Sequence, residues 1–262
     1  MKSFRKLVYP YMGWMGLFIV LPVVMIALYA FTIKGNDVLT MQFTFDNFIR
    51  FFNDSIFPSV LGRSLFLALR VTLICILLGY PAAYFMSRLP VKEQTMIVLL
   101  LTLPMWINML VRTYAWRGIL TPMGLSGETK VLIGMVYNFI PFMILQIYTV
   151  LVKIDNSLIK ASFDLGANKK QTFLKVILPL SIPGIVSGIT LVFLPAVSSF
   201  VIPQLLGGGD FILIGNLVQT YFITTGDWNF GSAISLILSI IILISMYITR
   251  KFDYSERGAK NE

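Results

Sequence analysis

The sequence of 262 residues has no histidine, one cysteine and few charged side chains. The absence of histidine excludes acid–base catalysis and metal binding through imidazole. Cys75 cannot form a disulfide within the chain, and its place in an apolar run is typical of a small packing residue. Charged residues make up 13% of the chain, against roughly 25% in soluble domains. Because 57% of the residues are hydrophobic and the mean hydropathy is +0.82, we expect the bilayer to be the solvent of this protein.

The net charge of +9 does not indicate nucleic-acid binding, because the basic residues lie between apolar runs and form no basic domain. Gly207, Gly208 and Gly209, followed by Asp210, do not match the phosphate-loop pattern G-x-x-x-x-G-K-[ST] and are interpreted as an outer turn. No Asp or Glu lies inside a long apolar run, which disfavours both a membrane enzyme and an ion-coupled secondary transporter. The sequence therefore predicts no catalytic residue and no metal site.

Six segments have about the 20 mostly apolar residues that a membrane span needs. They cover residues 12–33, 64–88, 95–117, 131–152, 182–206 and 231–249. Prolines interrupt the third and fifth, which a membrane tolerates where neighbouring helices or water satisfy the freed backbone groups. The first follows a signal-like basic start but is too long for a signal peptide, so we interpret it as a retained span. The sequence predicts one all-α integral membrane domain over residues 1–262.

Lysine and arginine are distributed unequally between the two sides of this arrangement. With the N-terminus inside, the inner segments hold 14 of the 21 Lys and Arg residues: Lys2, Arg5, Lys6, Arg88, Lys92, Lys153, Lys160, Lys169, Lys170, Lys175, Arg250, Lys251, Arg257 and Lys260. The outer segments hold six, Lys34, Arg50, Arg63, Arg112, Arg117 and Lys130, while Arg70 falls within the second span. The positive-inside rule therefore predicts that both termini are cytoplasmic. In the outer segment 34–63, the stretch FTFDNFIRFFND is either a short amphipathic surface helix or a plain connector.

A polar, basic segment lies between the fourth and fifth spans. Residues 157–168 read as a short helix that Gly166 breaks or turns, and residues 170–178 as a second helix that stops before Pro179. The apolar face of the first helix is formed by Leu158, Ala161, Phe163 and Leu165. Two short helices around a glycine form a compact projection that can dock into a partner. The alternative is a cytoplasmic linker with snorkelling lysines.

The spacing of this segment resembles the cytoplasmic coupling loop of type I ABC importer permeases, whose pattern is E-A-A, three residues, G, nine residues, I-x-L-P. The residues that the resemblance assigns to contact with an ATPase are Lys160, Ala161, Ser162, Asp164, Leu165, Gly166, Ala167, Val176, Leu178 and Pro179. The acidic first position of the pattern is Lys160 here, and the second alanine is Ser162. The resemblance implies a type I importer permease fold, with six transmembrane helices and a cytoplasmic coupling helix. It also implies that ATP and Mg are bound by a partner ATPase and that this chain holds no cofactor.

Much of the chain, roughly residues 12–250, resembles the B-type permease subunit of spermidine/putrescine importers. The matching stretches are LGYPAAYFMSRLP (78–90), LPMWINMLVRTYAW (103–116), LIGMVYNFIPFMILQIY (132–148), DLGANKKQTF (164–173), LLGGGDFILIGNLVQTYF (205–222) and DWNFGSAIS (227–235). The resemblance implies a bacterial inner-membrane complex with a C-type permease, two ATPase copies and an extracellular polyamine-binding protein. The alternative is a related importer for another small solute, including an anionic one.

Polar and aromatic residues near the third and fifth spans are candidates for the substrate pathway. They are Trp106, Asn108, Arg112, Tyr114, Trp116, Ser198 and Ser199. Asn108, Arg112 and Trp116 share one helical stripe at i, i+4 and i+8. The aromatic residues are alternatively an interfacial belt or core, and Arg112 alternatively snorkels to the outer interface. Since Arg70 and Arg112 would repel a polycation, either the second permease supplies carboxylates or the cargo is anionic.

Overall fold

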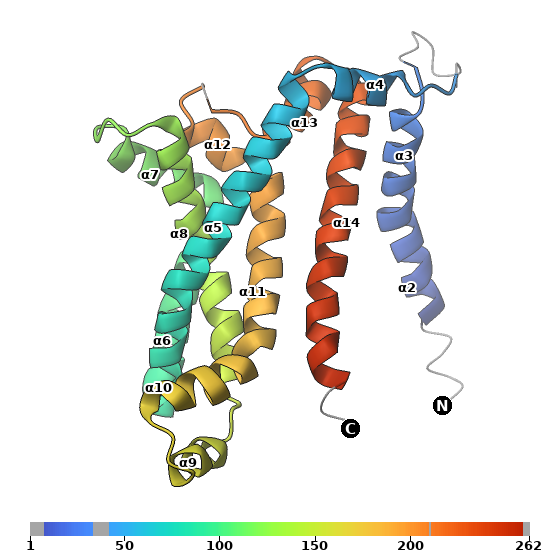
Figure 1. Ribbon diagram of the computed structural model, residues 1–262. Helices are drawn as coiled ribbons and strands as arrows, with labels where there is room; N and C mark the ends of the chain where they lie inside the picture. The colour runs from blue at the N-terminus through green and yellow to red at the C-terminus, as the bar shows by residue number, and fades with distance from the viewer. Residues whose placement is uncertain (1–7, 34–41, 210, 259–262) are drawn as a thin grey trace.

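The computed structural model describes residues 8–33, 42–209 and 211–258, which are almost entirely helical (Figure 1). In chain order the elements are α2 (Val8–Met15), η1 (Gly16–Val20), α3 (Leu21–Ala30), α4 (Asp46–Asn53), α5 (Ile56–Ser87), α6 (Val91–Trp106), α7 (Met109–Leu120), α8 (Gly127–Leu151), α9 (Asn156–Asp164), α10 (Lys169–Thr172), η2 (Phe173–Ile177), α11 (Leu178–Ser198), α12 (Val201–Leu206), α13 (Ile214–Gln219), η3 (Thr220–Thr224) and α14 (Trp228–Gly258). The three η elements are π-helical turns. Within the described residues five helices are long and apolar enough to cross a membrane, or six if the bent pair α6 and α7 is one span.

The core is formed where α5, α8 and α11 pack side by side (Figure 1). Small residues let these helices approach closely, as is common between membrane helices. A Cβ added at Gly184 of α11 would lie 3.0 Å from the Gln146 carbonyl oxygen, and one added at Gly79 of α5 would lie 3.1 Å from Met143 Cγ. Hydrogen bonds join the same helices, since the Tyr80 hydroxyl lies 2.9 Å from Ser181 Oγ. The core thus combines close backbone packing with buried polar links.

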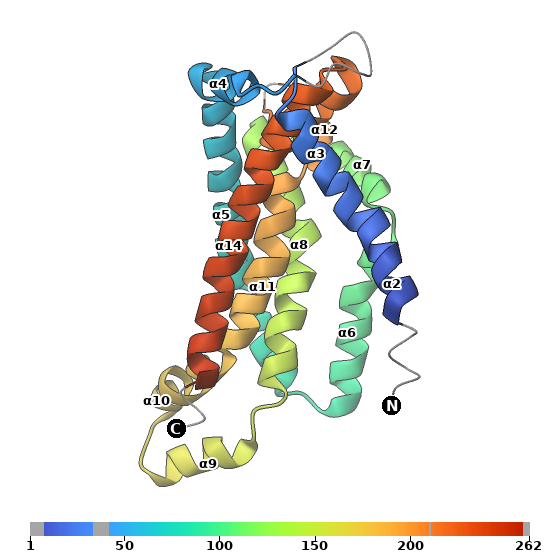
Figure 2. The ribbon, with the colours of Figure 1, turned by 90° about the vertical axis from the view of Figure 1, so that its right-hand side faces the viewer.

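The first membrane helix, Tyr9–Ala30, has no buried residue in its most apolar window and runs beside α14 (Figures 1 and 2). Polar contacts that link distant parts of the chain hold its C-terminal end, at residues 29–32. Asn229 Nδ2 donates to the carbonyl oxygens of Tyr29 (3.1 Å) and Thr32 (2.9 Å), and Asn47 Nδ2 donates to that of Ala30 (3.0 Å). These side chains satisfy carbonyl groups that a helix end leaves free.

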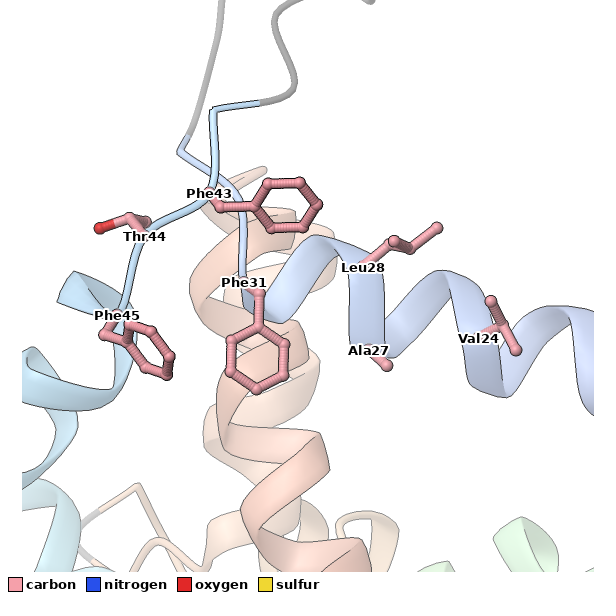
Figure 3. A pocket seen from close by; sticks show the side chains of 7 residues that line it. All are labelled: Val24, Ala27, Leu28, Phe31, Phe43, Thr44 and Phe45. Carbon is pink, nitrogen blue, oxygen red and sulfur yellow. The ribbon is translucent and has the colours of Figure 1, made fainter.

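A hollow of about 360 Å³ lies beside this C-terminal end, between α3 and the segment that leads to α4 (Figure 3). Its lining is Val24, Ala27, Leu28, Phe31, Phe43, Thr44 and Phe45. The ring of Phe31 packs edge-on against Phe45, at 5.5 Å between centroids. The hollow is therefore lined partly by aromatic side chains and lies at the C-terminal end of α3.

The stretch FTFDNFIRFFND contains a true helix, α4, so the helical alternative is correct for Asp46–Asn53. The helix lies across one end of the bundle (Figure 1) and buries Phe51 while Phe52 is exposed. Arg50 links it to the start of α14, because it forms an ion pair at 3.2 Å with Asp227, the residue before that helix, and lies 4.1 Å from the Phe230 ring centroid.

Two of the predicted spans are not single helices. The segment 95–117 is broken at Ile107 and Asn108, whose ψ angles of 135° and 132° are extended, and α6 and α7 meet at 90°. The Asn108 side chain caps α7 by accepting from Leu110 N at 2.8 Å, which favours a helix start there. The segment 182–206 is likewise divided, because α11 ends at Ser198 and α12 begins at Val201.

The predicted helix end before Pro179 is wrong, because the helix continues from Lys169 to Ser198. The π-helical turn η2 explains the continuity. Leu178 N–H donates to the Phe173 carbonyl, five residues back, and the shifted register precedes the proline that has no N–H to donate. The first membrane helix repeats this arrangement, with η1 before Leu21 and Pro22.

Substitution of Gly215 tests how closely α13 packs against the chain at Ser198 and Ser199. A Cβ at this position would lie 2.6 Å from the Ser198 carbonyl oxygen and 2.8 Å from that of Ser199. Neither backbone group can move aside, so we expect Gly215→Ala to destabilise the protein by about 1–3 kcal/mol. A lower melting temperature of the purified protein in detergent would report this. Gly118→Ala is the control, because a Cβ there meets nothing within 4 Å, and equal melting temperatures for the two variants would contradict the prediction.

Candidate functional site

The loop between α9 and α10 turns at Gly166, whose φ is +82°. Ala167 N–H donates to the Ser162 carbonyl at 3.0 Å, and Gly166 N–H donates to that of Phe163 at 2.9 Å. This pair of bonds is the Schellman motif that commonly ends a helix with glycine. Gly166 therefore turns the chain, as the sequence predicts, and it does so in a backbone conformation that a β-branched residue resists.

Side-chain caps define the two helices on either side of this turn. Asp155 Oδ1 accepts from Ser157 N at 2.8 Å at the start of α9. This hydrogen bond lowers the pKa of the Asp155 carboxyl, and Lys160 lowers it further. Asn168 and Gln171 form a capping box at α10, with both bonds at 2.9 Å.

A buried hydroxyl pair joins α9 to α10. Ser162 Oγ lies 2.9 Å from Thr172 Oγ1 and donates to the Ile159 carbonyl at 2.7 Å. Both side chains are buried. Ser162, which replaces the second alanine of the coupling pattern, thus acts inside the loop and fixes the angle between its two helices.

The loop exposes apolar side chains at one end of the molecule. Leu165 is 89% exposed, Leu158 48% and Phe163 44%. Lys160, Ala161 and Asp164 are also exposed, Ala167 is half-buried, and α9 stands clear of the bundle (Figures 1 and 2). Val176, Leu178 and Pro179 lie apart from this surface, in the helix that enters the core. An exposed apolar patch rimmed by charge is typical of a protein-binding surface.

Phe173 connects the loop to the membrane core. Its ring packs edge-on against two α5 side chains, Tyr80 at 5.8 Å and Tyr84 at 5.5 Å between centroids. We call Phe173, Tyr80 and Tyr84 the aromatic clasp. Because Tyr80 also bonds Ser181 in α11, the clasp links the loop to both α5 and α11.

A cavity of about 540 Å³ lies among α6, α7, α8, α11 and α14. Its lining is Met105, Arg112, Asn138, Phe139, Phe142, Thr190, Leu191, Leu194, Pro195 and Met246. Arg112 Nη2 donates to Asn138 Oδ1 at 2.9 Å, whereas Arg112 Nε is buried without a hydrogen-bond partner among the described residues. The cavity is apolar except for this amide–guanidinium pair and Thr190.

Among the predicted pathway residues only Arg112 lines this cavity. Trp116 packs against Tyr137, at 5.0 Å between ring centroids, and Tyr114 and Trp106 are exposed. The predicted three-residue stripe is wrong, because Asn108 caps α7 and only Arg112 and Trp116 lie within it. Ser199 Oγ is buried without a partner in the described structure, beside α13 rather than in the cavity. Asn138 and Thr190 were missed, although an amide inside an apolar run is a signal that could have identified Asn138.

Arg70 is not a free intramembrane charge. It forms an ion pair with Glu128, which lies in the first turn of α8 and therefore inside a helix long enough to span the membrane. The helix α8 begins at Gly127 rather than at residue 131, so it includes Glu128 in its first turn. Arg70 consequently does not repel a cation as a bare charge would.

The fold and the exposed helical loop define a multi-pass membrane component of a transport system. The chain belongs to the binding-protein-dependent transport system inner membrane component family, whose match covers residues 1–257. It is 38% identical over 255 residues to the spermidine/putrescine transport system permease protein PotB of Salmonella typhimurium strain SL1344, covering 90% of this chain and 88% of that one. The PotB protein of Escherichia coli K12 is 37% identical over 90% of this chain and 92% of its own length. Among solved structures, a chain of the bacterial alginate ABC transporter in complex with an alginate pentasaccharide-bound periplasmic protein superposes with a TM-score of 0.70 at 12% identity, over 96% of this chain and 95% of that one.

Proposed function

We propose that this chain is a permease subunit of an ATP-driven importer and forms half of a pathway for polyamines of the spermidine/putrescine class. We propose polyamines as the cargo because the chain is similar to two PotB permeases over 90% of its length. The partners are a C-type permease, two copies of an ATPase that binds ATP and Mg, and an external polyamine-binding protein. The chain itself does not hydrolyse ATP, and its helices line the pathway and change position during transport.

The exposed loop supports the docking of an ATPase. The loop has a fixed shape, because capped helices, a glycine turn and the Ser162–Thr172 pair hold it, and it presents Leu165 outward. A preformed apolar knob of this kind can enter a cleft on a partner at little ordering cost. The contact with a basic ATPase group that an acidic residue at position 160 would make is absent, since Lys160 stands there.

We further propose that the end of the molecule that carries α9 faces the cytoplasm. The first turn of α2 and the end of α14 lie at this same end (Figure 1), while residues 1–7 and 259–262 lie outside the described part of the chain. The Lys and Arg distribution supports this orientation.

Cysteine labelling in intact cells tests the orientation. In a Cys75→Ser background, Lys153→Cys should resist a membrane-impermeant maleimide applied from outside, whereas Met123→Cys should react. Both positions are exposed and lie in turns at opposite ends of α8, so access alone decides the result. Rapid external labelling of Lys153→Cys would reverse the assignment.

Arg112 favours a second candidate cargo, an anionic solute, because a guanidinium with a buried, unpartnered Nε lines the cavity. The complete complex in proteoliposomes separates the two candidates. We expect binding protein loaded with spermidine or putrescine to stimulate ATP hydrolysis several-fold, and a small dicarboxylate to have no effect. Stimulation by the dicarboxylate alone would overturn the polyamine assignment.

A further inference from the structure

Arg112 differs from the other membrane-domain arginines whose ion pairs the structure shows. Arg50 pairs with Asp227, and Arg70 pairs with Glu128. Among the described residues Arg112 has no carboxylate within ion-pair distance, and its one polar side-chain contact is the neutral amide oxygen of Asn138. The Arg112 side chain is half-buried and its Nε is buried without a partner among the described residues, so a carboxylate placed beside it would form a charge-assisted hydrogen bond that the described chain does not supply.

The depth of Arg112 decides which anion can reach it. Its partner Asn138 is the twelfth residue of the 25-residue helix α8. At 1.5 Å per residue, Asn138 lies about 17 Å from the start of that helix, near its middle. Lipid phosphates lie in the headgroup regions outside the roughly 30 Å hydrocarbon core. A protein carboxylate is therefore the anion that fits, rather than a lipid headgroup.

The cavity is also open to a second protein. Phe142, Leu191 and Met246 line it and are 38%, 43% and 44% exposed on the isolated chain. An apolar rim around one unpaired cation is complementary to an acidic side chain carried on an apolar helix. In a heteromeric importer the second permease is the membrane partner able to cover this face.

We propose that a carboxylate of the second permease subunit enters this cavity and forms an ion pair with Arg112 when no cargo is present, and that an ammonium group of the cargo displaces Arg112 from that carboxylate during transport. The inference depends on the proposed function, since it requires a heteromeric importer of a polycation. It makes Arg112 a counter-ion that holds the cargo-binding acid in place until cargo arrives. In the exchange the carboxylate passes from one cation to another, and Arg112 keeps its hydrogen bond to Asn138.

The pair can be tested with the assembled complex of both permeases and the ATPase, reconstituted with binding protein. Arg112→Gln should raise ATP hydrolysis in the absence of spermidine at least threefold and keep spermidine uptake, because the carboxylate is left unpaired. Arg112→Lys should behave close to wild type, since it retains a cation. Arg117→Gln is the matched control, as Arg117 lies on the same helix and is exposed outside the cavity.

A structure of the assembled complex without cargo supplies a readout that does not depend on activity. We expect a carboxylate oxygen of the second permease within about 4 Å of the Arg112 guanidinium, the usual ion-pair limit. Absence of any such carboxylate, or unchanged basal hydrolysis in Arg112→Gln, would overturn the proposal. Loss of uptake in Arg112→Gln with dicarboxylate-stimulated hydrolysis in wild type would instead place an anionic cargo on Arg112, and the proposed function would fail with it. Spermidine stimulation of wild type without the carboxylate pair would leave the proposed function standing and reject the inference alone.

Discussion

Replacing Gly166 with valine is expected to abolish ATP-driven uptake while the protein still inserts into the membrane. The φ of +82° at this position excludes a β-branched residue without strain, although no atom lies within 4 Å of an added Cβ. A left-handed conformation costs an ordinary residue about 1–2 kcal/mol, and a β-branched one more. The Schellman bonds between α9 and Gly166–Ala167 then weaken and Leu165 leaves its position. Uptake and co-purification of the ATPase would measure the loss.

Gly124 offers a matched control for this substitution. It also has a positive φ, +65°, and no atom lies within 4 Å of an added Cβ, but it lies in the turn between α7 and α8. Gly124→Val therefore introduces the same backbone strain at the other end of α8 and should keep the ATPase bound. Gly166→Asn should retain partial uptake, because asparagine tolerates the left-handed region better than valine. Equal losses in Gly166→Val and Gly124→Val would show that strain in general, and not coupling, causes the defect.

The exposed loop of α9 and α10 could be predicted in detail because its signals are local. A glycine that turns the chain and polar residues that cap short helices act through neighbouring backbone groups. The turn at Gly166 is confirmed, and the helix before it is Asn156–Asp164, so the predicted end at residue 168 is wrong. The continuation past Pro179 could not be predicted, since a local pattern reads proline as a helix end and η2 moves the hydrogen-bond register that accommodates it.

The membrane cavity was much harder to predict, because residues far apart in the sequence form it. Arg112, Asn138, Thr190 and Met246 come from four different helices. Hydropathy locates such helices but does not give their rotation or the 90° break before α7. A regular helical stripe through Asn108 was expected from spacing alone, whereas its side chain caps the next helix.

The partner of the Arg70 charge could not be predicted from the sequence. Arg70 falls in an apolar run, and its partner Glu128 lies 58 residues later, just outside the predicted boundary of the fourth span. Hydropathy places span ends poorly when a helix begins with residues such as Gly127, Glu128 and Lys130. The ion pair between Arg70, near the middle of α5, and Glu128, in the first turn of α8, therefore had to come from the three-dimensional structure.

Removing the aromatic clasp is expected to separate ATP hydrolysis from uptake. Phe173→Ala deletes two edge-to-face contacts, with Tyr80 and Tyr84, each worth about 0.5–1.5 kcal/mol beyond simple burial. If the clasp transmits loop movement into α5, a loss of about 1–3 kcal/mol lowers the coupling roughly 5- to 150-fold. The ATPase should still bind, because the Gly166 turn and exposed Leu165 are untouched.

The measurement for this variant is spermidine taken up per ATP hydrolysed in proteoliposomes that contain the complete complex. Phe173→Ala should lower this ratio while hydrolysis persists, and Phe173→Tyr should restore it because an aromatic edge is retained. Leu174→Ala is the control, since Leu174 is the next residue, is 48% exposed and has no part in the clasp. An unchanged ratio in Phe173→Ala would show that force reaches the core by another route. A fall of the same size in Leu174→Ala would show that any truncation in η2 disturbs the helix, and that the rings themselves do not carry the movement.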